Sequence, residues 1–214
     1  MKSGNTGVNG RPKPNPQAHA HPDWQFRGPL YIERILDVVT CGVIKRCFLT
    51  QTPKNRSFQG IVDPAKRHCE FVILPDTYDS VFHAFAQRHI PLFFGVSIDS
   101  SSHHPAIAYR YPPGIGFIPH CDQVTPIEIE RAKTNNQPVM SGDFTLVFFL
   151  SDPLSYGGGE LYFPEHGIEF KPPAGSLVVF PAVPNFIHGV SEVTYGERDT
   201  AVYRVHIAAH KVLA

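Results

Sequence analysis

The segment FIPHCDQ, residues 117–123, places three potential metal ligands side by side, His120, Cys121 and Asp122. The proline and the apolar run before this triplet disfavour a helix and favour an extended strand. Alternate residues of a strand share one face, whereas residues two apart on a helix do not face each other. The pattern therefore predicts that His120 and Asp122 act together on a metal ion, and that Cys121 packs against the opposite layer.

Two protein ligands are too few, and a third should come from a strand distant in the sequence. His188, in NFIHGVSEV, is the best candidate because it follows the apolar strand SLVVFPA and a short turn. Two histidines and one carboxylate on one side of a metal, with the opposite positions open, are typical of non-haem Fe(II) oxygenases. A His-x-Asp pair alone is a weak signal, and a lone histidine is more often structural, so a further feature is needed.

That feature is Arg198, which follows His188 by ten residues. An enzyme that activates O₂ with Fe(II) needs a source of electrons. A 2-oxo acid can chelate the metal and supply them by losing CO₂. Its far carboxylate needs a fixed, permanently charged, bidentate partner, and arginine is the side chain that provides one.

The elements that would position these residues are mostly short strands. From about residue 95 onward, apolar runs alternate with glycine and proline, which indicates a β sandwich or barrel. The run FTLVFFL, residues 144–150, is apolar on both faces, so both faces of that strand should be covered. Helical spacing of apolar residues over 37–49 and 76–90 predicts two helices, which are the obvious cover.

Composition suggests a tail followed by one domain. Residues 1–28 contain four Pro, four Gly and three Asn with few large apolar side chains, a composition that cannot bury enough surface to order itself. We expect a flexible tail over 1–28, anchored near its end by Trp24 and Phe26. A single domain should follow over 29–214, with helical support over 29–95 and a β core over 96–210.

The charge balance and the spacing of the cysteines limit the binding partners and the cellular location that we expect. Lys and Arg together number 19, as do Asp and Glu, so there is no electrostatic reason to expect nucleic acid or an anionic membrane as a partner. No apolar run has the length of a membrane-spanning helix, and the first residues lack the apolar segment of a secretory signal. The four cysteines form no CxxC pair, which favours free thiols and a cytoplasmic location.

Taken in order from about Tyr109 to Ile207, the motifs resemble a known family. YPPGIGFIPHCD, DFTLVFFLSD, GGGELYFP, PPAGSLVVFP and HGVSEVTYGERDTAVYR are similar to the prolyl 4-hydroxylase branch of the Fe(II)/2-oxoglutarate-dependent dioxygenases. The resemblance implies a mainly β fold with flanking helices, a double-stranded β-helix or jelly roll. It implies Fe(II) held by His120, Asp122 and His188, O₂ as co-reactant, and 2-oxoglutarate held partly by Arg198. Ascorbate dependence is common in this branch, and the resemblance leaves it open here.

Other residues are assigned to the site with less support. The resemblance places Tyr111 near the bound cosubstrate, and Thr200 shares the inward face of its strand, so both are expected to contact it. Phe149 stands where relatives often carry a Tyr whose hydroxyl helps to bind the cosubstrate, so that hydrogen bond should be absent. Phe149 and Gln123, which directly follows the His-x-Asp pair, are expected either near the substrate or behind the ligands.

Arg204 is a second departure, because many relatives carry Trp at this position. By the period of two, Arg204 points the same way as Arg198, so it should also enter the barrel. A buried arginine needs an anion. One alternative is a protein carboxylate, most simply Asp122, which Arg204 would orient. The other is a carboxylate on the substrate, and an acidic or amino-acid substrate would then follow.

Together with the resemblance, these residues lead us to expect an oxidoreductase that hydroxylates an unactivated C–H bond of a small molecule or amino acid. One alternative is a hydroxylase of a prolyl or other residue in a peptide or protein. An alternative of another class is a non-catalytic jelly-roll binding module of the cupin type. The complete set of His-x-Asp, His and Arg disfavours the binding module, because a binder needs no anchor for a cosubstrate.

Overall fold

The structure is a computed structural model that describes residues 22–55, 69–100, 104–134 and 141–208. Its helices are the 3-10 turns η1 (Pro22–Phe26) and η2 (Pro184–Phe186) and the α-helices α1 (Val38–Thr50), α2 (Asp76–Phe94) and α3 (Pro126–Thr134). The other regular elements are short strands, as the punctuated apolar runs predicted.

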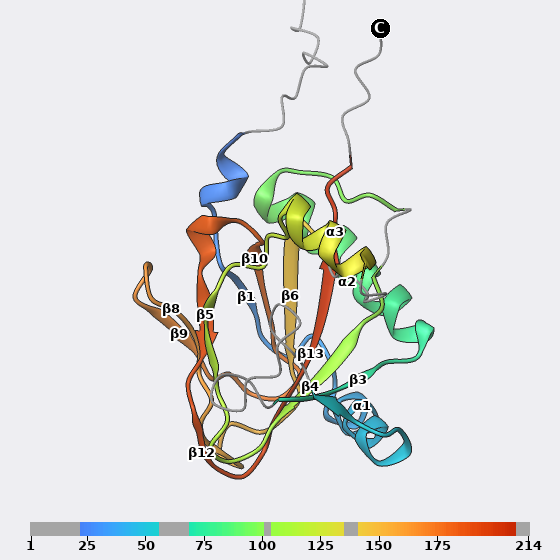
Figure 1. The fold of residues 1–214 in the computed structure, drawn as a ribbon, viewed down its shortest axis with the longest axis vertical. Coiled ribbons are helices and arrows are strands. Elements are labelled where there is room, and N and C mark those ends of the chain that lie inside the picture. The colour runs from blue at the N-terminus through green and yellow to red at the C-terminus, as the bar shows by residue number, and fades with distance from the viewer. Residues whose placement is uncertain (1–21, 56–68, 101–103, 135–140, 209–214) are drawn as a thin grey trace, which may run out of the picture.

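The strands form two facing antiparallel sheets and a short ribbon (Figure 1). The larger sheet has the order β1-β10-β6-β13-β4-β3-β2, where the strands are β1 (Leu30–Ile32), β10 (Leu177–Pro181), β6 (Phe144–Phe149), β13 (Arg198–Val205), β4 (Ile107–Tyr111), β3 (Glu70–Ile73) and β2 (Lys54–Asn55). The smaller has the order β5-β11-β8-β9, comprising β5 (Phe117–His120), β11 (His188–Val190), β8 (Leu161–Phe163) and β9 (Ile168–Phe170). The ribbon pairs β12 (Val193–Tyr195) with β7 (Gly157–Gly158).

Helices α1 and α2 cover the outer face of the larger sheet (Figure 1). The ring of Phe82 on α2 stacks on Phe148 of β6, with centroids 4.1 Å apart. All six residues of β6 are buried, because one face meets the helices and the other meets the interior of the sandwich. The predicted cover of this strand is thus confirmed, and the architecture is the predicted jelly roll with flanking helices.

The packed part of the chain begins earlier than the predicted boundary at residue 29. Trp24 of η1 is buried, and its ring lies 5.0 Å from that of Phe144. Phe26, which we expected to help anchor the tail, is 70% exposed, so that expectation was wrong. Residues 22–28 therefore already belong to the fold, while residues 1–21 of the tail predicted over 1–28 lie outside the described residues.

A buried carboxylate fastens α1 to the larger sheet. The Asp199 side chain is fully buried and accepts hydrogen bonds from Arg110 Nε at 2.8 Å and Nη2 at 3.3 Å. Lys45 of α1 places its Nζ 3.4 Å from the same carboxylate. Because Asp199 lies between Arg198 and Thr200, its contacts hold β13 from the face opposite the cavity described below.

Asp199→Asn should lower the free energy of unfolding by about 1–3 kcal/mol, because it removes one charge of a mostly buried group of ions. Urea denaturation measures the loss. Glu197→Gln is the matched control, since Glu197 lies 3.5 Å from the same Arg110 but its side chain is 53% exposed. An exposed pair of this kind contributes at most about 1 kcal/mol. Equal losses for the two variants would contradict a special role for the buried carboxylate.

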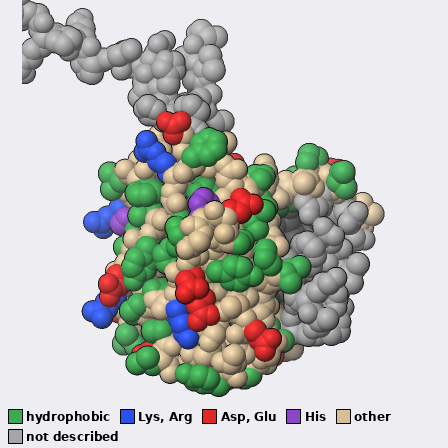
Figure 2. All heavy atoms as spheres, turned by 90° about the vertical axis from the view of Figure 1, so that its left-hand side faces the viewer, with side chains coloured by type: hydrophobic (Ala, Val, Ile, Leu, Met, Phe, Trp, Pro, Cys, Tyr) green, Lys and Arg blue, Asp and Glu red, His purple; other side chains and the backbone are tan. Residues whose placement is uncertain are grey.

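On the side of the molecule shown in Figure 2, side chains of one charge do not gather into a patch. There, acidic and basic side chains are scattered among apolar ones, as the balanced composition suggested. All four cysteines are free, in agreement with the prediction from their spacing. Within the described part of the chain, none of the helices has the length and apolar character needed to cross a membrane.

Candidate active site

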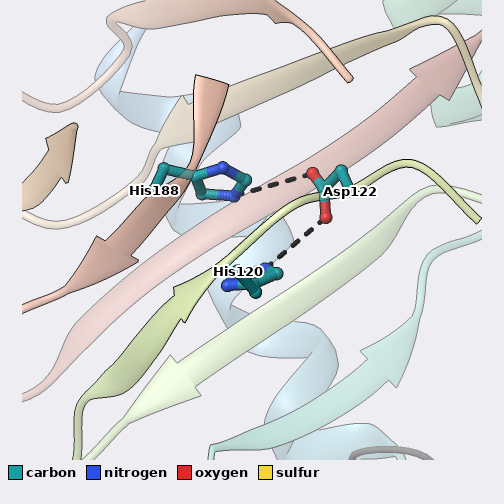
Figure 3. Close-up of side chains that lie close together, drawn as sticks. All are labelled: His120, Asp122 and His188. Carbon is teal, nitrogen blue, oxygen red and sulfur yellow. Dashed lines mark ion pairs between the residues drawn. The ribbon is translucent and has the colours of Figure 1, made fainter. Parts of the chain in front are cut away.

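His120, Asp122 and His188 meet between the two sheets (Figure 3). One ligand atom from each lies within 4.8 Å of the other two. The Nε2 atoms of His120 and His188 lie 3.5 Å and 3.6 Å from the two carboxylate oxygens of Asp122. An ion with bonds of about 2.1 Å holds neighbouring ligand atoms roughly 3 Å apart, so a small inward movement would place all three on one metal.

Strand pairing brings the distant histidine to the site. His188 begins β11, which pairs antiparallel with β5, and the two histidines lie directly opposite each other in that register. Their rings are 4.4 Å apart between centroids. Asp122 lies just beyond β5, which ends at His120, so the strand predicted to carry both residues is shorter than expected. The extended chain after β5 nevertheless turns the carboxylate to the same side as His120.

Both histidines are oriented by their own backbone. His120 Nδ1 lies 3.0 Å from the carbonyl oxygen of Ile118, and His188 Nδ1 lies 3.0 Å from that of Phe186. A carbonyl accepts only from a protonated nitrogen, so Nδ1 carries the hydrogen and the Nε2 lone pair faces Asp122. Metal-bound histidines are usually oriented in this way by a hydrogen bond from the other ring nitrogen.

The charges at the group also suit a cation. Burial would raise the pKa of Asp122, but Arg204 together with His188 and His120 holds it well below its usual value. Burial lowers the pKa of His188 to about 4, so its imidazole is neutral near pH 7. An ionised carboxylate and a neutral imidazole are the protonation states that a metal ion needs.

Two residues hold the carboxylate of Asp122 from behind. Thr145 of β6 donates its hydroxyl to Oδ2 at 2.7 Å, and Arg204 of β13 donates Nη2 to Oδ1. The Arg204 side chain is 8% exposed, so this contact provides the anion that a buried arginine needs. Sequence reasoning missed Thr145, although a polar residue in a strand that is otherwise apolar on both faces was a usable signal.

One cavity joins this group to Arg198. Its wall includes the three candidate ligands and the inward residues of β13, which are Arg198, Thr200, Val202 and Arg204. The predicted period of two along this strand is therefore confirmed. Arg198 is 2% exposed, and its guanidinium lies 5.0 Å from the ring centroid of Tyr111 and 5.3 Å from that of Phe149.

The structure brings most, but not all, of the predicted residues together. Tyr111 and Thr200 line the cavity. Phe149 lies beside Arg198, and its ring carries no hydroxyl group that could bind the cosubstrate. Gln123 is exposed and is not among the described residues that line the cavity. Cys121 is half-buried rather than packed in the opposite layer, and its sulfur accepts a hydrogen bond from the Gln123 backbone at 3.3 Å.

A jelly roll whose cavity holds two histidines and a carboxylate has the ligand set that is typical of non-haem Fe(II) oxygenases. Comparison with known proteins agrees, since residues 106–207 match the family model of the 2OG-Fe(II) oxygenase superfamily. Residues 106–207 therefore resemble that superfamily, and the comparisons include proteins of the prolyl-hydroxylase-like type that the motifs indicated.

Three similar proteins illustrate the match. A PKHD-type hydroxylase of Gluconacetobacter diazotrophicus is 37% identical over 97 residues, which are 44% of this chain and 39% of that protein. The viral collagen prolyl hydroxylase of Paramecium Bursaria Chlorella virus-1 is 20% identical with a TM-score of 0.61, covering 84% of this chain and 96% of that one. A Trichoplax adhaerens prolyl hydroxylase, solved with a peptide fragment of a hypoxia inducible factor, is 14% identical with a TM-score of 0.65, covering 86% of each chain.

These similarities differ in what they establish. At 20% identity or less, the two solved structures show the fold alone. The curated relatives match at higher identity, but this chain spans less than half of their length. The activity and the substrate of this protein are therefore a separate question, which depends on its own site.

Proposed function

We propose that this protein is an Fe(II)- and 2-oxoglutarate-dependent dioxygenase that hydroxylates an unactivated C–H bond. In the overall reaction, the substrate, O₂ and 2-oxoglutarate give the hydroxylated substrate, succinate and CO₂. One oxygen atom enters the product and the other enters succinate. The observation that carries the proposal is the presence, in one cavity, of a buried His-Asp-His group and a separate buried arginine.

The residues present fit a ferrous ion. His120 and His188 would each bind it through Nε2, since their Nδ1 atoms face backbone carbonyls, and Asp122 would bind through its carboxylate. The three ligands approach from one side, which leaves room for a chelating 2-oxo acid and O₂. When bound, the iron supplies the redox chemistry that couples loss of CO₂ from the 2-oxo acid to oxidation of the substrate.

Arg198 is assigned to the far carboxylate of 2-oxoglutarate. The guanidinium is buried at the opposite end of the inward face of β13 from Arg204, which lies at the metal end. Two aromatic rings flank it and exclude water, which strengthens its attraction for an anion. Tyr111 and Thr200 line the space between and would contact the cosubstrate. A jelly-roll module that only binds a ligand has no need for this second, distant cation.

The substrate proposed here is a small molecule or free amino acid, and a peptidyl residue is the second candidate. The solved Trichoplax complex with a peptide fragment supports considering the peptide, because its fold is similar. A screen of amino acids, small metabolites and proline-containing peptides, scored by substrate-stimulated succinate and by ¹⁸O₂ incorporation, separates the candidates. Stimulation only by peptides would overturn the small-molecule proposal. Omitting ascorbate in the same screen tests whether turnover needs it.

Arg204 is proposed to orient Asp122 rather than to bind substrate, since it already donates to that carboxylate. Arg204→Met should weaken Fe(II) binding about 10- to 100-fold, the usual cost of losing a partner behind a metal ligand. Equilibrium titration of the anaerobic protein with Fe(II) measures the change. Thr145→Val is a matched variant, because it removes the other contact to Asp122 and should act in the same direction.

The alternative role of Arg204 predicts a different pattern. If Arg204→Met leaves iron binding and substrate-free turnover of 2-oxoglutarate intact but abolishes stimulation by substrate, then Arg204 binds a substrate carboxylate. That result would contradict the orienting role and would favour an acidic or amino-acid substrate.

A further inference from the structure

Tyr156, which plays no part in the site described so far, has a buried hydroxyl next to Arg198. The residue is 1% exposed, and this burial raises the pKa of its hydroxyl, while Arg198 lies close enough to interact with the phenol oxygen and to lower the pKa in part. No acceptor for the hydroxyl hydrogen is found among the described residues. The same is true of Arg198 Nε. Leaving a buried donor without an acceptor costs roughly 1–3 kcal/mol, so the unused hydrogens of these two neighbouring side chains suggest that a ligand accepts them.

Gly159 brings these two side chains together. A Cβ atom at Gly159 would lie 2.9 Å from Arg198 Cδ and 2.9 Å from Tyr156 Cε2, closer than real Cβ contacts allow. The stem of the arginine and the edge of the phenol ring therefore pack against the same bare α-carbon. The positive φ of 71° at Gly159 also favours glycine here.

Lys171 fixes the ring of Tyr156 from the other side. Its Nζ donates to the backbone carbonyl of Tyr156 at 3.0 Å and lies 4.6 Å from the centre of the ring. Lys171 is held in turn by Glu160, whose carboxylate lies 3.7 Å from Nζ. The phenol is therefore held in place before any ligand arrives, which limits the entropy lost on binding.

A carboxylate bound at Arg198 would have room for a further, uncharged hydrogen-bond donor. A carboxylate has about four lone-pair positions, and one bidentate guanidinium satisfies two of them. The rings of Tyr111 and Phe149 face the guanidinium, and Phe149 has no hydroxyl to offer. Tyr156 is not among the described residues that line the cavity, but it packs beside Arg198 at Gly159. Its hydroxyl hydrogen has no acceptor among the described residues and is available to donate.

We propose that the Tyr156 hydroxyl donates a hydrogen bond to the distal carboxylate of 2-oxoglutarate bound at Arg198. It would thereby replace the hydroxyl that is missing at Phe149. The inference rests on the proposed function, because it requires 2-oxoglutarate at Arg198. Tyr156 would be a further cosubstrate-binding residue. It would contact the distal carboxylate of 2-oxoglutarate and not the 2-oxo acid group.

The test is calorimetric titration of the protein loaded with Mn(II) in place of Fe(II), so that binding is measured without turnover. The two ligands are 2-oxoglutarate and 2-oxovalerate, which has the same number of carbons but no distal carboxylate. Tyr156→Phe should weaken 2-oxoglutarate binding roughly 10- to 100-fold, the effect of losing a hydrogen bond to a charged group. Binding of 2-oxovalerate should change less than about twofold.

Tyr203→Phe is the matched control, because Tyr203 is a buried tyrosine on the same strand as Arg198 but faces α2, where its hydroxyl lies 3.4 Å from His83. It should leave both affinities unchanged. Unchanged 2-oxoglutarate binding in Tyr156→Phe, or an equal loss for both ligands, would overturn the inference. If the unmodified protein does not prefer 2-oxoglutarate to 2-oxovalerate, then the proposed cosubstrate site itself fails, and the inference with it.

Discussion

Asp122→Ala should reduce Fe(II) binding and turnover of 2-oxoglutarate to background, a loss of at least about 100-fold. The substitution removes the only carboxylate of the three-residue group and leaves two imidazole ligands. It also leaves Arg204 buried without the carboxylate it contacts, which repels an incoming cation. Metal content after anaerobic loading and CO₂ release from 2-oxoglutarate measure the two losses.

Two further variants test whether the loss is specific to the proposed metal ligands. His188→Ala should have the same effect without disturbing Arg204, so it separates loss of a ligand from loss of the ion pair. Cys121→Ala should leave iron and turnover nearly intact, since the half-buried thiol is not part of the His-Asp-His group and accepts a hydrogen bond from the Gln123 backbone. Iron retained by a folded Asp122→Ala protein and lost from Cys121→Ala would contradict the assignment of the ligands.

Arg198→Ala should raise the KM for 2-oxoglutarate by about 30-fold or more. The substitution removes the charged partner of a buried carboxylate, which costs on the order of 2–5 kcal/mol. Steady-state CO₂ release over a range of 2-oxoglutarate concentrations gives KM and kcat. The effect should fall mainly on KM, because Arg198 lies away from the three residues proposed to hold the metal.

Phe149→Tyr is the informative companion variant. Phe149 lies 5.3 Å from the Arg198 guanidinium, so a hydroxyl added to its ring should be tolerated and should lower KM if it reaches the carboxylate. An Arg198→Ala enzyme with an unchanged dependence on 2-oxoglutarate would exclude the assigned role, whatever Phe149→Tyr does.

The inward face of β13 could be predicted because a buried strand has a period of two. Once Arg198 was assigned to the interior, Thr200 and Arg204 followed, and the structure places all three in one cavity. By contrast, local sequence patterns do not predict that His188 lies directly opposite His120. This pairing depends on the register between β11 and β5, strands far apart in sequence, and no local pattern fixes such a register.

The residues that sequence reasoning missed depend on tertiary contacts. Thr145 of β6 donates its hydroxyl to Asp122, and the role proposed for Tyr156 depends on its packing beside Arg198. Asp199 was overlooked because an acidic residue between two inward-facing ones is normally exposed, whereas here α1 covers it. At the other end of the chain, composition alone could not show that Trp24 packs on Phe144.

The most direct test of the central claim is release of CO₂ from 1-labelled 2-oxoglutarate by the purified protein, with succinate measured in the same samples. We expect CO₂ and succinate in equal amounts, strictly dependent on added Fe(II) and O₂, and absent from a folded Asp122→Ala variant. If no candidate substrate gives iron-dependent release above that variant, or if the variant is as active as the unmodified protein, then this cavity is not a 2-oxoglutarate-dependent oxygenase site.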